Sequence, residues 1–108
     1  MWLVREGNVL AVAESPSSRR GRVRGLLGLD GYEGALVLRP CRSVHTVRMR
    51  FTIDVAFCED SGVVLKTLKM KPWRVSPLVW KASFVIEAEA GSFARWNLRV
   101  GDRIEVLP

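Results

Sequence analysis

VHTVRMRFTIDVAF, residues 44–57, carries the strongest secondary-structure signal of this 108-residue chain. Read at every second residue, it separates into an apolar set (His45, Val47, Met49, Phe51, Ile53, Val55, Phe57) and a mostly polar set (Val44, Thr46, Arg48, Arg50, Thr52, Asp54, Ala56). Such alternation is typical of a β-strand with one buried face. Because strands rarely exceed about ten residues, we expect a bend or bulge near residues 50–52.

Working outward, the flanking segments predict more short strands. Gly7-Asn8 between two apolar runs predicts a β-hairpin over residues 2–13. Ser15-Pro16 predicts the start of a helix that ends near Gly28 and carries several arginines. Further strands are expected at 35–39, 63–70, 80–90 and 103–107, with a turn or single helical turn at 91–98.

The expected strand over residues 80–90 alternates in the same way. Its inward set is Trp80, Ala82, Phe84, Ile86, Ala88 and Ala90, and its outward set is Lys81, Ser83, Glu87 and Glu89. Glu87 and Glu89 are interpreted as facing solvent. Taken together, the segments predict a mainly β fold: one domain over residues 1–108, a small sandwich or barrel of about seven short strands with one packed α-helix.

Charge and hydropathy narrow the classes of partner. Seventeen basic and eleven acidic residues give a net charge of +6, which favours an anionic small molecule or nucleic acid, although the basic residues are spread out and also fit an ordinary solvated surface. No apolar run approaches the ~20 residues of a membrane span. With Arg5 interrupting the N-terminal apolar residues, we expect no signal peptide, no membrane contact and a cytoplasmic location. The oligomeric state has no signal in the sequence.

Catalytic chemistry has few candidates. Cys41 and His45 are the possible nucleophile and base, and Asp54 could orient the ring if the strand bends. The alternative is a buried thiol beside a hydrogen-bonded histidine. One histidine and two cysteines seventeen residues apart do not form a metal site, and no cofactor is expected. Both cysteines are expected to be reduced thiols.

Ligand binding is the favoured function. The polar groups along the central strand (Ser43, His45, Thr46, Arg48, Asp54), with Arg24 from the helix, predict a pocket for a small or anionic ligand. For Asp54 the alternative is an ion pair or the acceptance of backbone N–H bonds. Two other functions remain open: a hydrolase acting on phosphodiesters through His45, and a structural or accessory interaction domain. Whether the protein is an enzyme is therefore undecided. Trp73-Arg74 and Trp80 could also stack nucleic-acid bases, or simply cover the core.

Several motifs occur together in a recognisable order: RVRGLLG (22–28), PCRSVHT (40–46), MRFTIDVAF (49–57), PWR (72–74) and LRVGD (98–102). In this order and spacing the chain resembles the domain of unknown function 192 family. The resemblance implies a compact, mostly β fold and no established activity. It singles out as site residues Arg24, Ser43, His45, Thr46, Met49 and Asp54.

Overall fold

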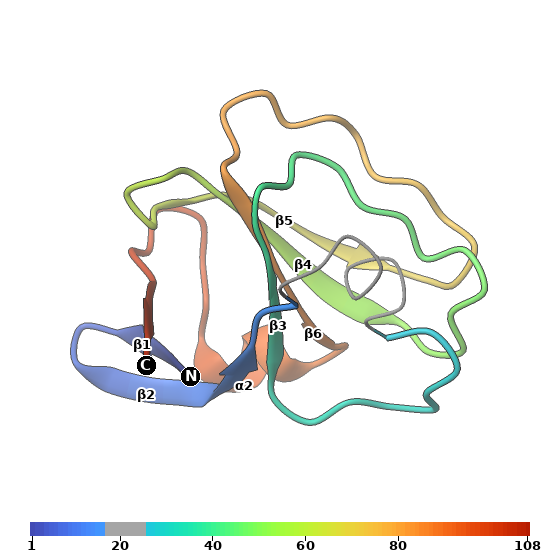
Figure 1. The fold of residues 1–108 in the computed structure, drawn as a ribbon, viewed down its shortest axis with the longest axis horizontal. Helices are drawn as coiled ribbons and strands as arrows, with labels where there is room; N and C mark the ends of the chain where they lie inside the picture. The colour runs from blue at the N-terminus through green and yellow to red at the C-terminus, as the bar shows by residue number, and fades with distance from the viewer. Residues whose placement is uncertain (17–25) are drawn as a thin grey trace.

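The computed structural model describes residues 1–16 and 26–108, and it confirms the predicted mainly β fold (Figure 1). Within these ranges there are seven strands and one short helix: β1 Trp2–Arg5, β2 Asn8–Glu14, β3 Ala35–Leu38, β4 Ile53–Cys58, β5 Val64–Met70, β6 Phe84–Glu89, α2 Ser92–Trp96 and β7 Glu105–Leu107. Most of the helix predicted after Pro16, with Arg24, lies outside the described residues. The helix that is described, α2, lies where the sequence predicted a turn or a single helical turn.

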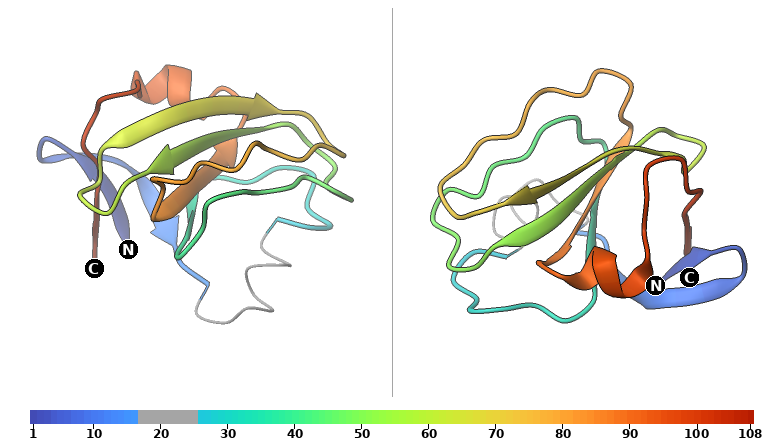
Figure 2. Two further views of the ribbon diagram at one scale, coloured as in Figure 1. Left: turned by 90° about the horizontal axis from the view of Figure 1, so that it is seen from above. Right: turned by 180° about the vertical axis from the view of Figure 1, so that it is seen from behind.

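The strands form one sheet in the order β5-β4-β6-β3-β2-β1-β7. All neighbouring pairs are antiparallel except β2 and β3, which run parallel where Ala13 pairs with Ala35. The sheet curls so that the segments preceding its two edge strands meet (Figures 1 and 2). Val63 forms an isolated bridge with Arg103, and the Val64 N–H donates to the Asp102 carbonyl at 2.8 Å. The open sheet thereby takes a barrel-like shape, with the two termini side by side on β1 and β7.

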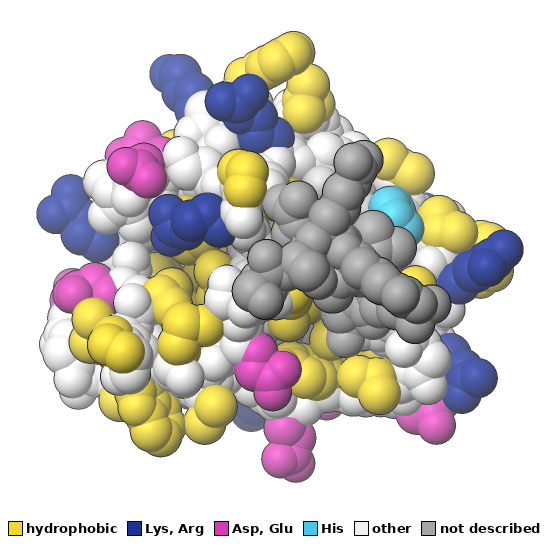
Figure 3. Space-filling view, in the orientation of Figure 1, with side chains coloured by type: hydrophobic (Ala, Val, Ile, Leu, Met, Phe, Trp, Pro, Cys, Tyr) yellow, Lys and Arg dark blue, Asp and Glu magenta, His cyan; other side chains and the backbone are white. Residues whose placement is uncertain are grey.

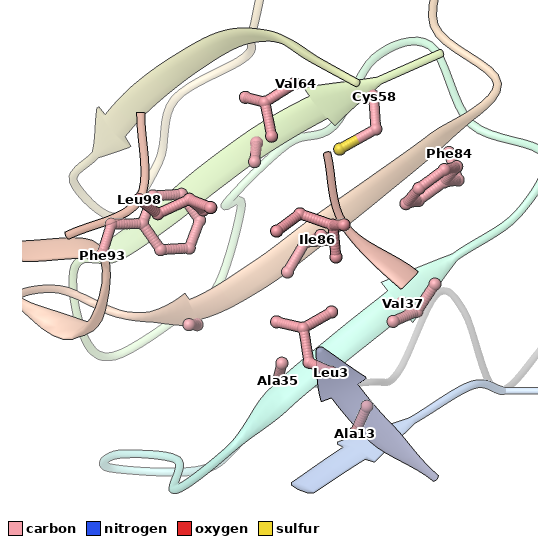
Figure 4. Packing of buried hydrophobic residues seen from close by; sticks show 13 residues of the cluster. Leu3, Ala13, Ala35, Val37, Cys58, Val64, Phe84, Ile86, Phe93 and Leu98 are labelled. Carbon is pink, nitrogen blue, oxygen red and sulfur yellow. The ribbon is translucent and has the colours of Figure 1, made fainter. Parts of the chain in front are cut away.

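The concave side of the curl encloses a first hydrophobic cluster, here called the inner core (Figure 4). Its buried members come from nearly every strand and from α2: Leu3, Ala13, Ala35, Val37, Ala56, Cys58, Val64, Phe84, Ile86, Ala88, Phe93, Leu98 and Ile104. The predicted inward positions Phe84, Ile86 and Ala88 of β6 are among them. Cys58 is a fully buried thiol, and burial raises its pKa to about 12.

A second cluster, the outer core, covers the opposite face of the same strands. Its buried members are Leu26, Leu36, Leu38, Val44, Met49, Ile53, Val55, Phe57, Met70, Ala82 and Val85. Two long loops, residues 39–52 and 71–83, run side by side over this face and close it (Figure 2). We call them the paired loops. Because both faces of the sheet are covered, every residue of β4 and the first five residues of β6 are buried.

Backbone hydrogen bonds hold the paired loops together. The Thr46 N–H donates to the Arg74 carbonyl, and the Ser76 N–H donates to the Val44 carbonyl, both at 2.8 Å. His45 forms an isolated antiparallel bridge with Val75 between these two bonds. This arrangement corrects the predicted strand over residues 44–57, because regular strand begins only at Ile53 and the preceding residues belong to a loop.

The predicted alternation of faces fails at the start of the stretch. Ile53, Val55 and Phe57 are fully buried as predicted, and in the loop Met49 is buried between exposed Arg48 and Arg50, but at residues 44–46 the order is reversed, with His45 exposed and Thr46 fully buried. The strand predicted over residues 80–90 is likewise shorter, since β6 begins at Phe84 and Trp80 is 72% exposed. Glu87, expected to face solvent, is only 6% exposed because the paired loops lie over its side of the sheet.

Candidate functional site

A cavity of about 240 Å³ lies between the sheet and the first of the paired loops, residues 39–52, with Leu26 and Leu27 in its wall. Most of its described lining is apolar, and it includes four polar or titratable side chains; the lining residues are Leu26, Leu27, Leu38, Pro40, Cys41, Ser43, Val44, His45, Met49 and Glu87. Three of the residues that the sequence predicted for the site, Cys41, Ser43 and His45, therefore meet here. Met49, which the family resemblance singled out, joins them.

Glu87 contributes a buried carboxyl group to this cavity. It pairs with Leu36 of β3 and Val55 of β4, so it lies in the middle of the sheet. Its neighbours Ile86 and Val85 belong to the inner and outer cores respectively, which places the Glu87 side chain on the outer side, under the paired loops. Burial raises the pKa of Glu87 from its ordinary value of 4.5 to about 7.

The Glu87 carboxyl group has no partner within residues 1–16 and 26–108. No hydrogen bond or ion pair joins it to another described residue. Every fully enclosed side-chain nitrogen or oxygen of these residues does have a hydrogen-bond partner, so the Glu87 oxygens keep access to the cavity. Glu87 is thus 6% exposed as a residue while its carboxyl oxygens stay open to the cavity, where they can accept hydrogen bonds from whatever occupies it.

The polar residues of the loop form the rim. The Ser43 hydroxyl donates to the Ser76 carbonyl at 3.3 Å or contacts the Ser76 hydroxyl at 3.2 Å. The His45 Nδ1 accepts the Val47 N–H at 3.3 Å, so in the neutral ring the proton is carried by Nε2. The Cys41 thiol donates to the Ser43 carbonyl at 3.2 Å. The cavity thus offers a ring N–H donor at its rim and a carboxyl group inside.

Thr46 does not line this cavity; it ties the paired loops together. Its Oγ1 donates to the Lys71 carbonyl at 2.6 Å and accepts the Arg74 N–H at 2.9 Å. Its own carbonyl accepts the N–H groups of Met49 and Trp73. One buried threonine therefore ties the loop that carries the rim residues to residues 71–74 of the other loop.

Thr46→Val should lower the free energy of unfolding by about 2 kcal/mol, because the Lys71 carbonyl and the Arg74 N–H lose their partner while shape and burial are kept. This loss of stability is at the low end of what two backbone groups without a partner would cost, because Lys71 and Arg74 are exposed residues. Urea denaturation measures the change. Thr67→Val is the matched control: its hydroxyl, on β5, has no hydrogen-bond partner among the described residues, and the substitution should change stability by less than about 0.5 kcal/mol.

Asp54 also lies away from the cavity, on the inner side of β4. Its Oδ2 accepts the N–H groups of Gly91 at 3.0 Å and Phe93 at 3.1 Å, at the start of α2. The structure therefore shows the backbone-acceptor alternative considered for this residue. Arg48 is exposed in the loop with φ of 66°, and Arg24 lies outside the described residues.

The structure also places the residues considered for metal binding, membrane contact and nucleic-acid binding. In the described ranges no three His, Cys, Asp or Glu side chains gather closely enough to hold a metal ion, and no helix there is long and apolar enough to cross a membrane. On the face shown in Figure 3, basic side chains are scattered around the margin with acidic ones among them, and the single histidine, cyan, is exposed. Trp73 and Trp80 are both exposed, at 62% and 72%.

Sequence reasoning missed Glu87 as a cavity residue. The alternation of residues 84–89 correctly separates Glu87 from Ile86, but it cannot tell whether the second face of a strand meets water or another layer. A signal was present in the two strands that pair with β6. Leu36 and Val55, beside Glu87 on this face, are both apolar, as expected for a covered sheet.

Two proteins with determined structures share this fold. A protein of unknown function from Novosphingobium aromaticivorans superposes with a TM-score of 0.76 at 17% identity, over 87% of this chain and 74% of that one. A Sinorhizobium meliloti protein described as a candidate transcription regulator gives a TM-score of 0.78 at 17% identity, over 96% of this chain and 89% of that one. At this level of identity the likeness establishes the fold alone.

Two curated proteins that resemble the chain in sequence come from archaea. A UPF0127 protein of Pyrococcus furiosus is 35% identical over 63 residues, 58% of this chain and 54% of that protein. A UPF0127 protein of Thermococcus sibiricus is 31% identical over 90 residues, 78% of this chain and 58% of that protein. The chain spans little more than half the length of these curated relatives. Residues 2–106 match the model of domain of unknown function 192, described as an uncharacterised ACR family. The chain therefore belongs to the domain of unknown function 192 family.

Proposed function

We propose that the protein is a binding module for a small ligand, and that the ligand occupies the cavity between the sheet and the loop of residues 39–52. The observation that carries this proposal is the Glu87 carboxyl group, which is 6% exposed, has no partner among the described residues and opens onto that cavity. A largely desolvated carboxyl group of this kind is stabilised when a ligand donates hydrogen bonds to it. Mostly apolar walls with a few converging polar groups are typical of small-molecule sites.

Size and lining restrict the ligand. About 240 Å³ is below the ~300–1,000 Å³ of pockets that take drug-sized molecules, so the ligand is compact. Apolar contact would come from Leu38, Val44 and Met49, and polar contact from Glu87 inside and His45 at the rim. The described lining includes no lysine or arginine, so it offers no positive counter-charge to an anionic ligand or a phosphodiester substrate. The net charge of +6 therefore comes from residues outside this described lining.

Cys41 provides a reporter for occupancy of the cavity. It is half-buried in the lining, whereas Cys58 is fully buried with a pKa raised to about 12, so N-ethylmaleimide at pH 7.5 should modify the native protein once, at Cys41. A compound from a fragment screen that binds in the cavity should slow this modification in proportion to its occupancy, as measured by intact mass spectrometry.

The matched control moves the reporter by one residue. In a Cys41→Ser/Arg42→Cys variant the thiol sits beside the cavity but outside its lining, and the same compound should leave its modification rate unchanged. The proposal is overturned if compounds bind the protein without protecting Cys41, or if a broad fragment screen yields no compound that protects it.

A further inference from the structure

We infer that the ligand carries a positively charged nitrogen, such as a primary amine, that pairs with the carboxylate of Glu87 inside the cavity. This inference rests on the proposed function and names the chemical class of its ligand. Its geometric basis is the position of Glu87 between Leu36 and Val55, under the loop of residues 39–52, with its oxygens open to the cavity. An ionised carboxylate only accepts hydrogen bonds, so its complement must be a donor.

Among residues 1–16 and 26–108, the groups next to Glu87 do not supply that donor. On β3 and β4 the adjacent residues are Leu36 and Val55, both apolar. On β6 itself the next residue of the same face is Glu89, which lines a different cavity together with Arg95. From the loop of residues 39–52 the titratable groups of the lining are Cys41 and His45; the Cys41 thiol donates to the Ser43 carbonyl, and the His45 Nδ1 accepts the Val47 N–H.

A cation is favoured over a neutral donor for an energetic reason. Glu87 ionises near neutral pH only against the cost of burying its charge. An alcohol or amide supplies one hydrogen bond but leaves that charge uncompensated, whereas an ammonium group supplies a hydrogen bond and the opposite charge in apolar surroundings. The net charge of +6 opposes a cation only at long range, and physiological salt screens such effects beyond about 8 Å.

Three ligands that share a benzyl group test the inference: benzylamine, benzyl alcohol, which has nearly the same shape, and benzyl phosphate, titrated against the full chain by NMR and calorimetry at pH 7.5. We expect benzylamine to bind at least tenfold more tightly than benzyl alcohol. Glu87→Gln should abolish this preference, and Glu89→Gln, on the same strand and the same face but outside the cavity, should keep it. Between pH 5.5 and 7.5 the affinity for benzylamine should rise as Glu87 ionises, while that for benzyl alcohol should not.

A second readout does not depend on any variant folding. Because the ammonium group favours the ionised carboxylate, benzylamine binding near pH 6.5 should release protons, seen as an observed enthalpy that changes with the ionisation enthalpy of the buffer. If benzyl alcohol protects Cys41 as well as benzylamine does and no protons are released, the ligand class is wrong while the binding module stands. Tighter binding of benzyl phosphate also overturns the inference. If no compound of the fragment screen protects Cys41, the binding module itself fails.

Discussion

Asp54→Ala should lower the free energy of unfolding by about 4 kcal/mol, the largest effect expected of any single substitution considered for this protein. Asp54 is 4% exposed, and its Oδ2 accepts two backbone N–H groups, from Gly91 and Phe93. Hydrogen bonds to a charged group contribute about 1.5–3 kcal/mol each, and alanine leaves both donors without a partner. Urea denaturation followed by tryptophan fluorescence measures the change.

The effect is large because α2 depends on this contact. A helix of five residues has no stability of its own, and Gly91, which precedes it, has φ of 98° and offers no side chain to cap it. The Asp54 carboxylate on β4 serves as the cap from outside the helix. Through α2 and the turn after it, Phe93 and Leu98 reach the inner core (Figure 4). Loss of the cap therefore loosens one end of that core.

Two variants bracket the prediction. Asp54→Asn keeps one carbonyl oxygen as an acceptor and should cost roughly half as much as alanine. Asp60→Ala removes a carboxylate that is 89% exposed and 3.5 Å from Arg39, and it should cost no more than about 0.5 kcal/mol. A loss below 1 kcal/mol in Asp54→Ala would show that the two N–H groups find other partners.

The elements that the sequence predicts correctly are those defined by local signals. Gly7 lies in the turn of the β1–β2 hairpin, with φ of 78°, a conformation that glycine adopts readily. Pro40 follows the end of β3 closely, as expected for a residue that cannot donate to a strand ladder. In both cases the information lies within a few residues of the element. The fold class follows from these local signals.

The elements that the sequence mispredicts depend on partners far along the chain. Thr46 is buried because its hydroxyl meets Lys71 and Arg74, which lie 25 and 28 residues away. The alternating pattern placed Thr46 and His45 on the wrong faces because it assumes a continuous β-strand. In the structure these residues belong to a loop, and individual hydrogen bonds to the other loop decide which side chains are buried. The sequence therefore predicts the rim residues of the candidate site, Ser43 and His45, but it does not predict the buried carboxyl group of Glu87 beneath them.

Glu87 is also the residue from which we expect the clearest dependence of stability on pH. Its pKa in the folded protein is raised to about 7, and that in the unfolded chain is near 4.5. Between these values the folded state binds more protons than the unfolded state, so the stability of the wild-type protein falls as pH rises from about 4.5 to 7. This shift in the pKa of Glu87 corresponds to about 3 kcal/mol of folding free energy, and all of it is lost at pH 8.

Glu87→Gln removes the titrating group while keeping its size and hydrogen-bonding capacity. Relative to wild type, the variant should be nearly unchanged at pH 4 and more stable by about 3 kcal/mol at pH 8, as measured by urea denaturation across this range. Glu89→Gln should show no comparable gain. A constant difference between Glu87→Gln and wild type from pH 4 to 8 would mean that the carboxyl group is not desolvated. A site that costs the free protein stability at neutral pH, and recovers it when a cation binds, is what the proposed ligand requires.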